Sequence, residues 1–213
     1  MRSNQILTIL AVAAGSLMAV NASAGQFGAS IYGAFNTHSM EDVNNDIEAT
    51  NQGLGTDYNK IENGFTGGLD LRMWANPNVM IMAGWEPLFS TAKDETDAAP
   101  DIKLTTHALS LSGAYFFPAQ GTARYGIGAG LGYYMAGGEI DGAPGNFSGG
   151  GVGFHFMGMS EWTVSPGFAV TAAAGYRIAK ISNMEFDSAE TTDLDYTGFT
   201  SRLGLSFYMP QAN

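Results

Sequence analysis

The stretch YGIGAGLGYYMAGG (residues 125–138) places a glycine at every second position, four times in succession, starting at Gly126. Alternate glycines occur in the phosphate-binding fingerprint G-x-G-x-x-G, where a strand turns tightly into a helix. The last glycine of that fingerprint is absent here, because Leu131 or Tyr133 stands in its place, depending on which glycine begins the count. A repeat of two residues instead predicts a β-strand with one face free of side chains.

The same period of two recurs along the chain. In GFTGGLDLRMW the apolar residues Phe65, Leu69 and Leu71 alternate with polar ones that include Asp70 and Arg72, whereas a helix would repeat every 3.6 residues. Each such segment is near the ~9–11 residues that a tilted strand needs to cross a bilayer. The segments predicted as strands are residues 26–37, 64–75, 79–89, 104–117, 124–137, 150–163, 168–181 and 196–209.

The connections between these segments alternate in length. Short turns rich in Pro, Gly and Asn occupy residues 75–78, 118–123 and 164–167. The longer connections hold 17 of the 20 carboxylates, and they are residues 38–63, 90–103, 138–149 and 182–195. Short turns at one end and long polar loops at the other are typical of outer-membrane barrels. The predicted fold is therefore all-β, an eight-stranded antiparallel up-and-down transmembrane β-barrel.

Charged residues within the strands lie on the face opposite the large apolar residues. Three carboxylates balance three arginines, which is expected of charges enclosed in a narrow lumen, where an unpaired charge is costly. A soluble lipocalin-like barrel with an apolar interior is the alternative, but it leaves the outward Phe, Leu and Tyr unexplained. The predicted lumen charge network consists of Asp70, Arg72, Glu86, His155, Glu161, Arg177 and Arg202. We expect the glycines of residues 125–138 to leave room for the long Arg and Glu side chains of opposite strands.

The N-terminus predicts export. Arg2 is followed by an apolar run, and Ala22-Ser23-Ala24 fits the small-x-small rule for signal peptide cleavage. We therefore expect a signal peptide over residues 1–24 and a barrel domain over residues 25–213. The chain has no cysteine, which excludes disulfides and thiol chemistry, and its formal net charge of −11 argues against nucleic acid as a partner.

The chain resembles the small eight-stranded outer-membrane β-barrels of bacteria, the group that includes the OmpA transmembrane domain, OmpX and OmpW. In the last strand, RLGLSFYM, the C-terminal assembly signal of that family is matched by Arg202, Gly204, Phe207 and Met209. The family usually ends on a terminal aromatic residue, whereas this chain has Met209 there and continues for four residues. The resemblance implies the bacterial outer membrane as location, a monomer, and three partners: outer-membrane lipid, lipopolysaccharide and the barrel-assembly machinery.

Two non-enzymatic functions are consistent with this pattern. One is a structural or adhesive scaffold with a plugged lumen and acidic extracellular loops. The other is a narrow channel or transporter for small solutes, hydrophobic ones included. A lumen wall of flexible, polarizable side chains would suit such solutes. That wall would include the lumen methionines Met80, Met82, Met157 and Met159.

A lipid A-modifying enzyme is the less favoured third hypothesis. Acyl transfer needs a nucleophile, a base and an orienting group within hydrogen-bond reach. Of the three histidines, His155 is about 20 Å along its strand from Glu161, His107 is on the apolar face, and His38 begins a polar loop beside Ser39. We therefore predict no catalytic residue and no cofactor. The run DVNNDIE (residues 42–48) only faintly resembles a calcium loop, and no metal site is predicted.

Overall fold

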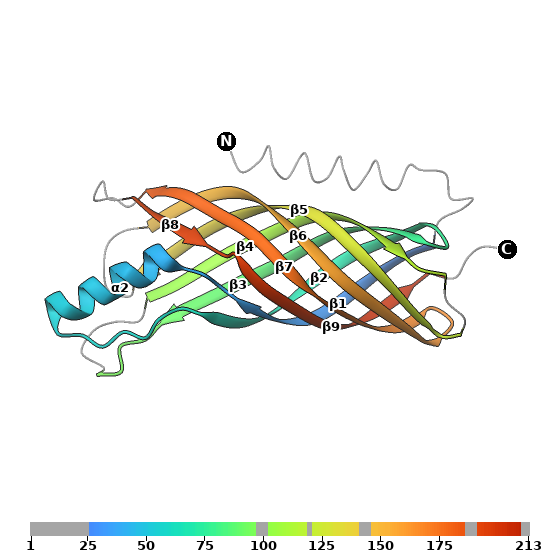
Figure 1. Ribbon diagram of the computed structural model, residues 1–213, viewed down its shortest axis with the longest axis horizontal. Helices are drawn as coiled ribbons and strands as arrows, with labels where there is room; N and C mark the ends of the chain where they lie inside the picture. Colours follow the sequence, from blue (N-terminus) through green and yellow to red (C-terminus); the bar gives the residue numbers. More distant parts are fainter. Residues whose placement is uncertain (1–25, 97–101, 119–120, 141–145, 186–190, 210–213) are drawn as a thin grey trace.

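The computed structural model describes residues 26–96, 102–118, 121–140, 146–185 and 191–209 (Figure 1). One helix and nine strands make up the described chain. In order they are β1 (Gln26–Thr37), α2 (Glu41–Leu54), β2 (Asn63–Asn76), β3 (Val79–Ala92), β4 (Ile102–Phe116), β5 (Ala123–Ile140), β6 (Asn146–Ser165), β7 (Phe168–Glu185), β8 (Thr191–Asp195) and β9 (Gly198–Tyr208). The predicted signal peptide, residues 1–24, lies outside the described residues.

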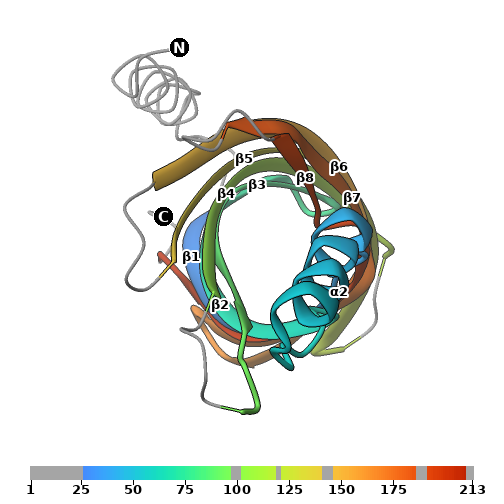
Figure 2. The same cartoon turned by 90° about the vertical axis from the view of Figure 1, so that its left-hand side faces the viewer.

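The strands form a closed antiparallel barrel. Each strand from β1 to β7 pairs with the next in sequence, and β9 pairs with both β7 and β1, which closes the ring (Figure 2). β8 continues the line of β9 along β7, so the two together serve as the eighth strand. The predicted eight-stranded antiparallel up-and-down barrel is confirmed.

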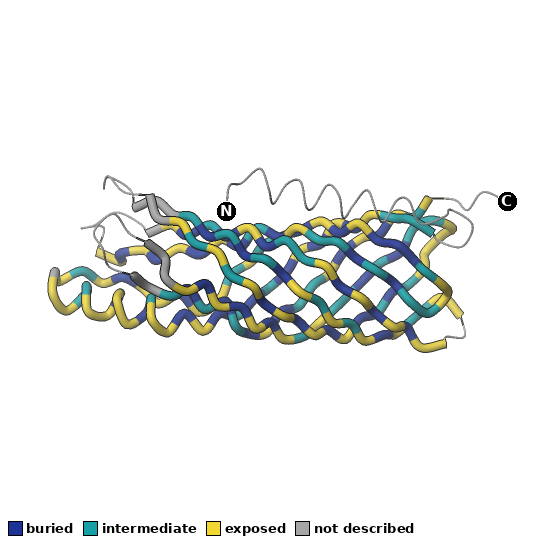
Figure 3. The backbone as a smooth tube through the Cα atoms, turned by 90° about the horizontal axis from the view of Figure 1, so that it is seen from above, coloured by how far each residue is buried: buried dark blue, intermediate teal, exposed yellow. Residues whose placement is uncertain are grey.

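Burial alternates along every strand, as Figure 3 shows for the whole wall. In β4, for example, Thr106 and Ser112 are buried inside the ring, whereas Leu111 and Tyr115 between and beyond them are exposed on its outer face. The barrel therefore has a filled interior that carries its polar and charged side chains, and an apolar exterior. This is the reverse of a soluble barrel, and it rules out the lipocalin-like alternative.

The long connections hold more regular structure than predicted. β5, β6 and β7 continue for three to four residues beyond their predicted ends, into residues 138–149 and 182–195. The first long connection contains α2, where the sequence predicts only a polar loop. No helix among the described residues has the length and hydropathy needed to span a membrane. We call the end of the barrel that carries α2 and the long connections the outer end (Figure 1).

Candidate functional site: the filled lumen

Glu86 of β3 is the centre of a charged layer halfway along the lumen. Its carboxylate accepts hydrogen bonds from Arg177 at 3.0 Å to each oxygen and from Arg202 at 2.6 Å. Asn36 and Tyr32 also donate to it, at 3.1 and 3.3 Å. Glu86 and Arg177 are each only 3% exposed. We call these five residues the upper ion cluster, in which one buried carboxylate binds two guanidinium groups.

A second group of charges lies nearer the short turns. Arg72 contacts Asp70 at 3.3 Å and Glu161 at 3.7 Å, and it donates a hydrogen bond to Ser206 Oγ at 2.8 Å. Glu161 also accepts a hydrogen bond from Tyr208. In this lower ion cluster two carboxylates face one guanidinium. The six predicted charges all lie in the lumen, but they form two clusters of opposite excess charge rather than one network, and Arg124 beside the buried Trp74 ring adds a fourth arginine to the predicted three.

His155 does not join either ion cluster. Its Nε2 lies 2.8 Å from Ser112 Oγ, and the backbone register places Gly130 of β5 between the two residues. A Cβ added at Gly130 would overlap Ser112 Oγ and come within 2.6 Å of His155 Nε2. The bare position at Gly130 therefore makes room for a serine–histidine contact that passes over β5, between β4 and β6. The expectation that the glycines accommodate Arg and Glu from opposite strands is wrong at this position.

The four predicted lumen methionines are all buried inside the barrel. They pack with Trp74, Ala114 and Phe116 in a base cluster near the short turns. Arg124, which the sequence analysis overlooked because it begins its strand, lies over the Trp74 ring at 5.0 Å. The base of the lumen is therefore filled with apolar side chains.

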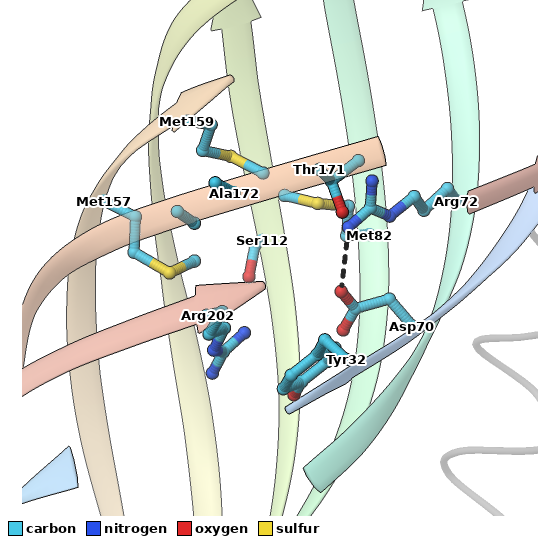
Figure 4. A pocket seen from close by; sticks show the side chains of 11 residues that line it. Tyr32, Asp70, Arg72, Met82, Ser112, Met157, Met159, Thr171, Ala172 and Arg202 are labelled. Carbon is cyan, nitrogen blue, oxygen red and sulfur yellow. Dashed lines mark hydrogen bonds and ion pairs between the residues drawn. The ribbon is translucent and has the colours of Figure 1, made fainter. Parts of the chain in front are cut away.

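A small cavity lies between the two ion clusters. Figure 4 shows Met157 and Met159 on one side of it, and Met82 beside Arg72 and Asp70 on the other. Its volume is about 20 Å³, which is room for roughly one water molecule. The cavity is too small for an organic solute.

The outer end of the lumen is closed by an apolar layer. Met40 and Ile47 of the α2 segment are buried, at 0% and 4% exposed, and α2 lies within the outline of the ring when the barrel is seen from this end (Figure 2). Asn44 fixes the helix, because its side chain exchanges hydrogen bonds with the backbone of Ile61 at 2.8 and 3.0 Å. The outer cluster comprises Met40, Ile47, Tyr58, Ile61, Leu88, Ala92, Leu104, Ala108, Tyr134, Ala136, Ala179, Ile181, Leu194 and Tyr196.

The residues of the calcium-like run lie on this helix rather than in a loop. Asp42 and Glu48 are exposed and form ion pairs with Lys180 at 3.7 Å and Lys60 at 3.3 Å. Among the described residues, no three His, Asp or Glu side chains are grouped so that they could hold a metal ion.

His38 enters the lumen with α2, contrary to the expectation of a polar loop residue. Its side chain is 7% exposed, and its ring meets the edge of Tyr196 at 5.2 Å between centroids. Its Nδ1 has no hydrogen-bond partner among the residues that the structure describes. Burial, with a further contribution from the positive charge of Arg177, lowers the pKa of His38 to about 4. The imidazole is therefore neutral at pH 7.

The four residues that match the assembly signal point to both sides of the wall. Arg202 and Gly204 face the lumen, where Arg202 binds Glu86 and the Tyr32 ring, while Phe207 and Met209 are exposed outside. Arg202 thus has a structural contact in the folded barrel, and a role of the four residues in assembly stays a prediction.

The lumen geometry and the apolar exterior agree with the comparison to known families. The model of the outer membrane protein β-barrel domain matches residues 7–207. The chain belongs to this outer-membrane β-barrel family. It is therefore a protein of the bacterial outer membrane. Barrels of this kind have short periplasmic turns and longer extracellular loops, so we expect the outer end to face the outside.

Solved outer-membrane barrels share the fold at low sequence identity. Neisserial surface protein A is 15% identical with a TM-score of 0.58, and the match covers 85% of this chain and 96% of that protein. A major outer membrane protein from Thermus thermophilus is 13% identical with a TM-score of 0.56, and the match covers 87% of this chain and 100% of that protein. OprG from Pseudomonas aeruginosa is 14% identical with a TM-score of 0.53, and the match covers 87% of this chain and 96% of that protein. Comparison with curated protein sequences gives no significant match.

Within the described part of the chain, sequence reasoning missed the pairing of Ser112 with His155, whose geometry is that of a nucleophile beside a base. Strand periodicity places both side chains in the lumen, but only the pairing of β4 and β6 with β5 brings them level. A serine hydroxyl bonded to an imidazole is the first half of a nucleophile–base pair. Ser112 faces the cavity of about 20 Å³, so the described lumen gives its hydroxyl no room for a substrate.

Proposed function

We propose that this outer-membrane barrel is a non-conducting, non-enzymatic scaffold that holds α2 and the acidic connections at the cell surface. The observation that carries the proposal is the filling of the lumen in successive layers. The outer cluster fills the outer end, the upper ion cluster follows it, and the lower ion cluster and the base cluster together fill the part nearer the short turns. The cavity of about 20 Å³ between the ion clusters is too small for solute passage.

Conductance in a planar lipid bilayer tests this proposal. We expect no channel steps from inserted protein at neutral pH. The variant Ile47→Asp should release α2 from the outer cluster, since it would bury a charge among apolar side chains. This variant should still show no channel steps, because the ion clusters continue to fill the middle of the lumen. Asn45→Asp, exposed on the same helix, is the matched control. Stable steps from the unmodified protein would refute a closed lumen.

The outer cluster favours a second candidate function, the uptake of a small apolar molecule. The fourteen buried residues of the outer cluster include Ile47 of the amphipathic helix α2, and most of the others form an apolar layer on the strands. If this layer receives ligands, the fluorescent probe N-phenyl-1-naphthylamine should bind to the folded barrel, and Ile47→Asp should change its affinity while Asn45→Asp should not. Absence of saturable binding would leave the scaffold as the supported function.

A further inference from the structure

The cavity of about 20 Å³ between the two ion clusters has hydrogen-bond donors in its lining. Arg72 of β2 and Arg202 of β9 lie on different sides of it, and Ser112 of β4 adds a hydroxyl group (Figure 4). A guanidinium group carries only donors, and a serine hydroxyl can donate or accept. The lining therefore offers N–H and O–H groups from three separate strands to an acceptor held in the cavity.

Two of these donors have no partner within the described part of the chain. They are the buried Nε atoms of Arg72 and Arg202. The terminal nitrogens of the same guanidinium groups are engaged, because those of Arg72 bind Asp70 and Ser206, and Arg202 binds Glu86. A buried donor without a partner is costly. Since both arginines line the cavity, an acceptor held there would supply the partner that their Nε–H groups lack.

Asp70 is the acidic residue of the lining, and its carboxylate is already engaged. Its Oδ2 accepts a hydrogen bond from Arg72 at 3.3 Å. A Cβ added at Gly84 of β3 would come within 2.6 Å of its Oδ1, so this oxygen lies against the bare backbone of β3. The negative charge of Asp70 is thus paired with Arg72, and it does not exclude an anion from the cavity.

The upper ion cluster carries an excess positive charge. Glu86 offsets one of the guanidinium groups of Arg177 and Arg202, and no other carboxylate among the described residues contacts either arginine. The excess carboxylate of the lower ion cluster faces a further arginine, because Glu161 is the register partner of Arg124. One positive charge therefore remains beside the cavity, inside the barrel, where an unpaired charge is costly.

We propose that this cavity binds one chloride ion. The ion accepts hydrogen bonds from the Nε–H groups of Arg72 and Arg202 and from the Ser112 hydroxyl, and the two arginine contacts are charge-assisted. The thioether groups of Met82 and Met157 on the cavity wall suit a polarizable anion. Chloride is only slightly larger than the water molecule for which the cavity has room. The ion is a fixed part of the filled lumen rather than a solute in transit.

The contact between Ser112 and His155 gains a role in this site. Ser112 Oγ lies 2.8 Å from His155 Nε2. The Ser112 hydroxyl can donate to chloride only when Nε2 carries a proton and donates it to Ser112 Oγ. The site therefore assigns the Nε2–H tautomer to His155, and the serine–histidine pair orients a donor toward the ion without any substrate.

Urea unfolding of the folded barrel in uncharged detergent micelles tests the site, with sodium chloride compared to sodium gluconate at equal ionic strength. A ligand that binds only the folded protein raises stability with the logarithm of its concentration. We expect chloride, and bromide in its place, to raise the unfolding midpoint, whereas gluconate is too large for the cavity. Ser112→Ala should weaken the apparent chloride affinity about tenfold, the loss of about one hydrogen bond to a charged group. Ser90→Ala, which removes a buried serine outside the lining, is the matched control and should not change it.

Two further experiments separate a bound ion from a general salt effect. Ala173→Val narrows the cavity without removing a donor, so it should abolish the chloride dependence. Anomalous diffraction from crystals grown in bromide should place one bromide ion in contact with Arg72 and Arg202. Heat-induced mobility on gels confirms that each variant is folded.

Either of two results would overturn the proposal. Equal midpoints in chloride and gluconate, or the absence of bromide from the cavity, would assign the cavity to water. A chloride effect of the same size in Ser112→Ala and Ala173→Val as in the unmodified protein would show a salt effect that does not come from this cavity.

Discussion

The outer end and the middle of the lumen are closed by different chemistry. At the outer end, apolar side chains from α2 and from the strands meet in the outer cluster, and the helix is held at its rim by surface ion pairs such as that of Lys180 with Asp42. In the middle, Glu86 binds two arginines that have no other carboxylate in contact with them among the described residues. The α2 segment can leave the outer cluster without leaving a charge unpaired in the lumen. The contacts of Glu86 cannot be broken without leaving a buried charge unpaired.

This difference separates a removable layer from a structural one. An apolar helix face leaves the lumen at a cost that scales with the area exposed, and the rest of the barrel can stay intact. Removal of one partner from a buried ion cluster leaves an uncompensated charge inside the wall. We therefore expect changes in the middle of the lumen to act on the whole barrel and changes at the outer end to act locally.

The largest effect is expected for Glu86→Gln. The substitution keeps the shape of the side chain but leaves Arg177 and Arg202 without their negative partner, so it should destabilise the barrel by about 3–5 kcal/mol. The temperature at which the folded band is lost on a gel, with urea unfolding in micelles, measures the change.

Glu48→Gln is the control for the loss of one carboxylate. Its ion pair with Lys60 is more than half exposed, and surface pairs contribute little, so its effect should stay below about 1 kcal/mol. Similar midpoints for the Glu86 and Glu48 variants would contradict the structural role of the upper ion cluster.

The fold could be read from the sequence because a β-barrel wall has strictly local rules. The period of two fixes which face each residue occupies, and turns such as that around Asn76 mark strand ends, where its side chain accepts from the backbone of Asn78 and Val79 at 2.9 Å. The first strand was predicted at its observed bounds. α2 was missed because residues 41–54 are mostly polar, and the few apolar positions are stabilised by contacts with the lumen rather than by helix propensity.

The lumen contacts could be predicted only as a set of residues. Periodicity places Glu86, Arg177 and Arg202 inside, but their partners depend on the stagger between strands, which the period of two does not determine. For the same reason Ser112 and His155 were placed on lumen faces without being paired. His38 was assigned to a loop because its burial depends on the packing of the α2 segment and of Tyr196, which strand periodicity does not show.

A smaller effect is expected within the middle of the lumen, at Gly130. A methyl group there would overlap Ser112 and His155, so Gly130→Ala should break their hydrogen bond and destabilise the barrel by about 2 kcal/mol. Gly113→Ala is the matched control, because a Cβ there meets nothing within 4 Å and points outward. Urea unfolding of both variants measures the difference, and equal midpoints would mean that the lumen can repack around Gly130.

The smallest effect is expected from acid, and it should appear only at the outer end. The lowered pKa of His38, about 4 against an ordinary value near 6.5, means that released His38 binds a proton more readily than buried His38. Docking of the α2 segment is therefore fully stable above pH 6.5 and weakens progressively as the pH falls toward 4. Between pH 7 and pH 5 we expect a loss of about 1.8 kcal/mol, visible as roughly twentyfold lower protection of α2 amides against hydrogen exchange after correction for intrinsic rates. His38→Phe keeps the ring beside Tyr196 and cannot titrate, so its protection should not change, while amides of β4 in either protein should report the unaltered wall. An equal loss in His38→Phe would assign the acid response to the surface carboxylates that hold α2, such as Asp42.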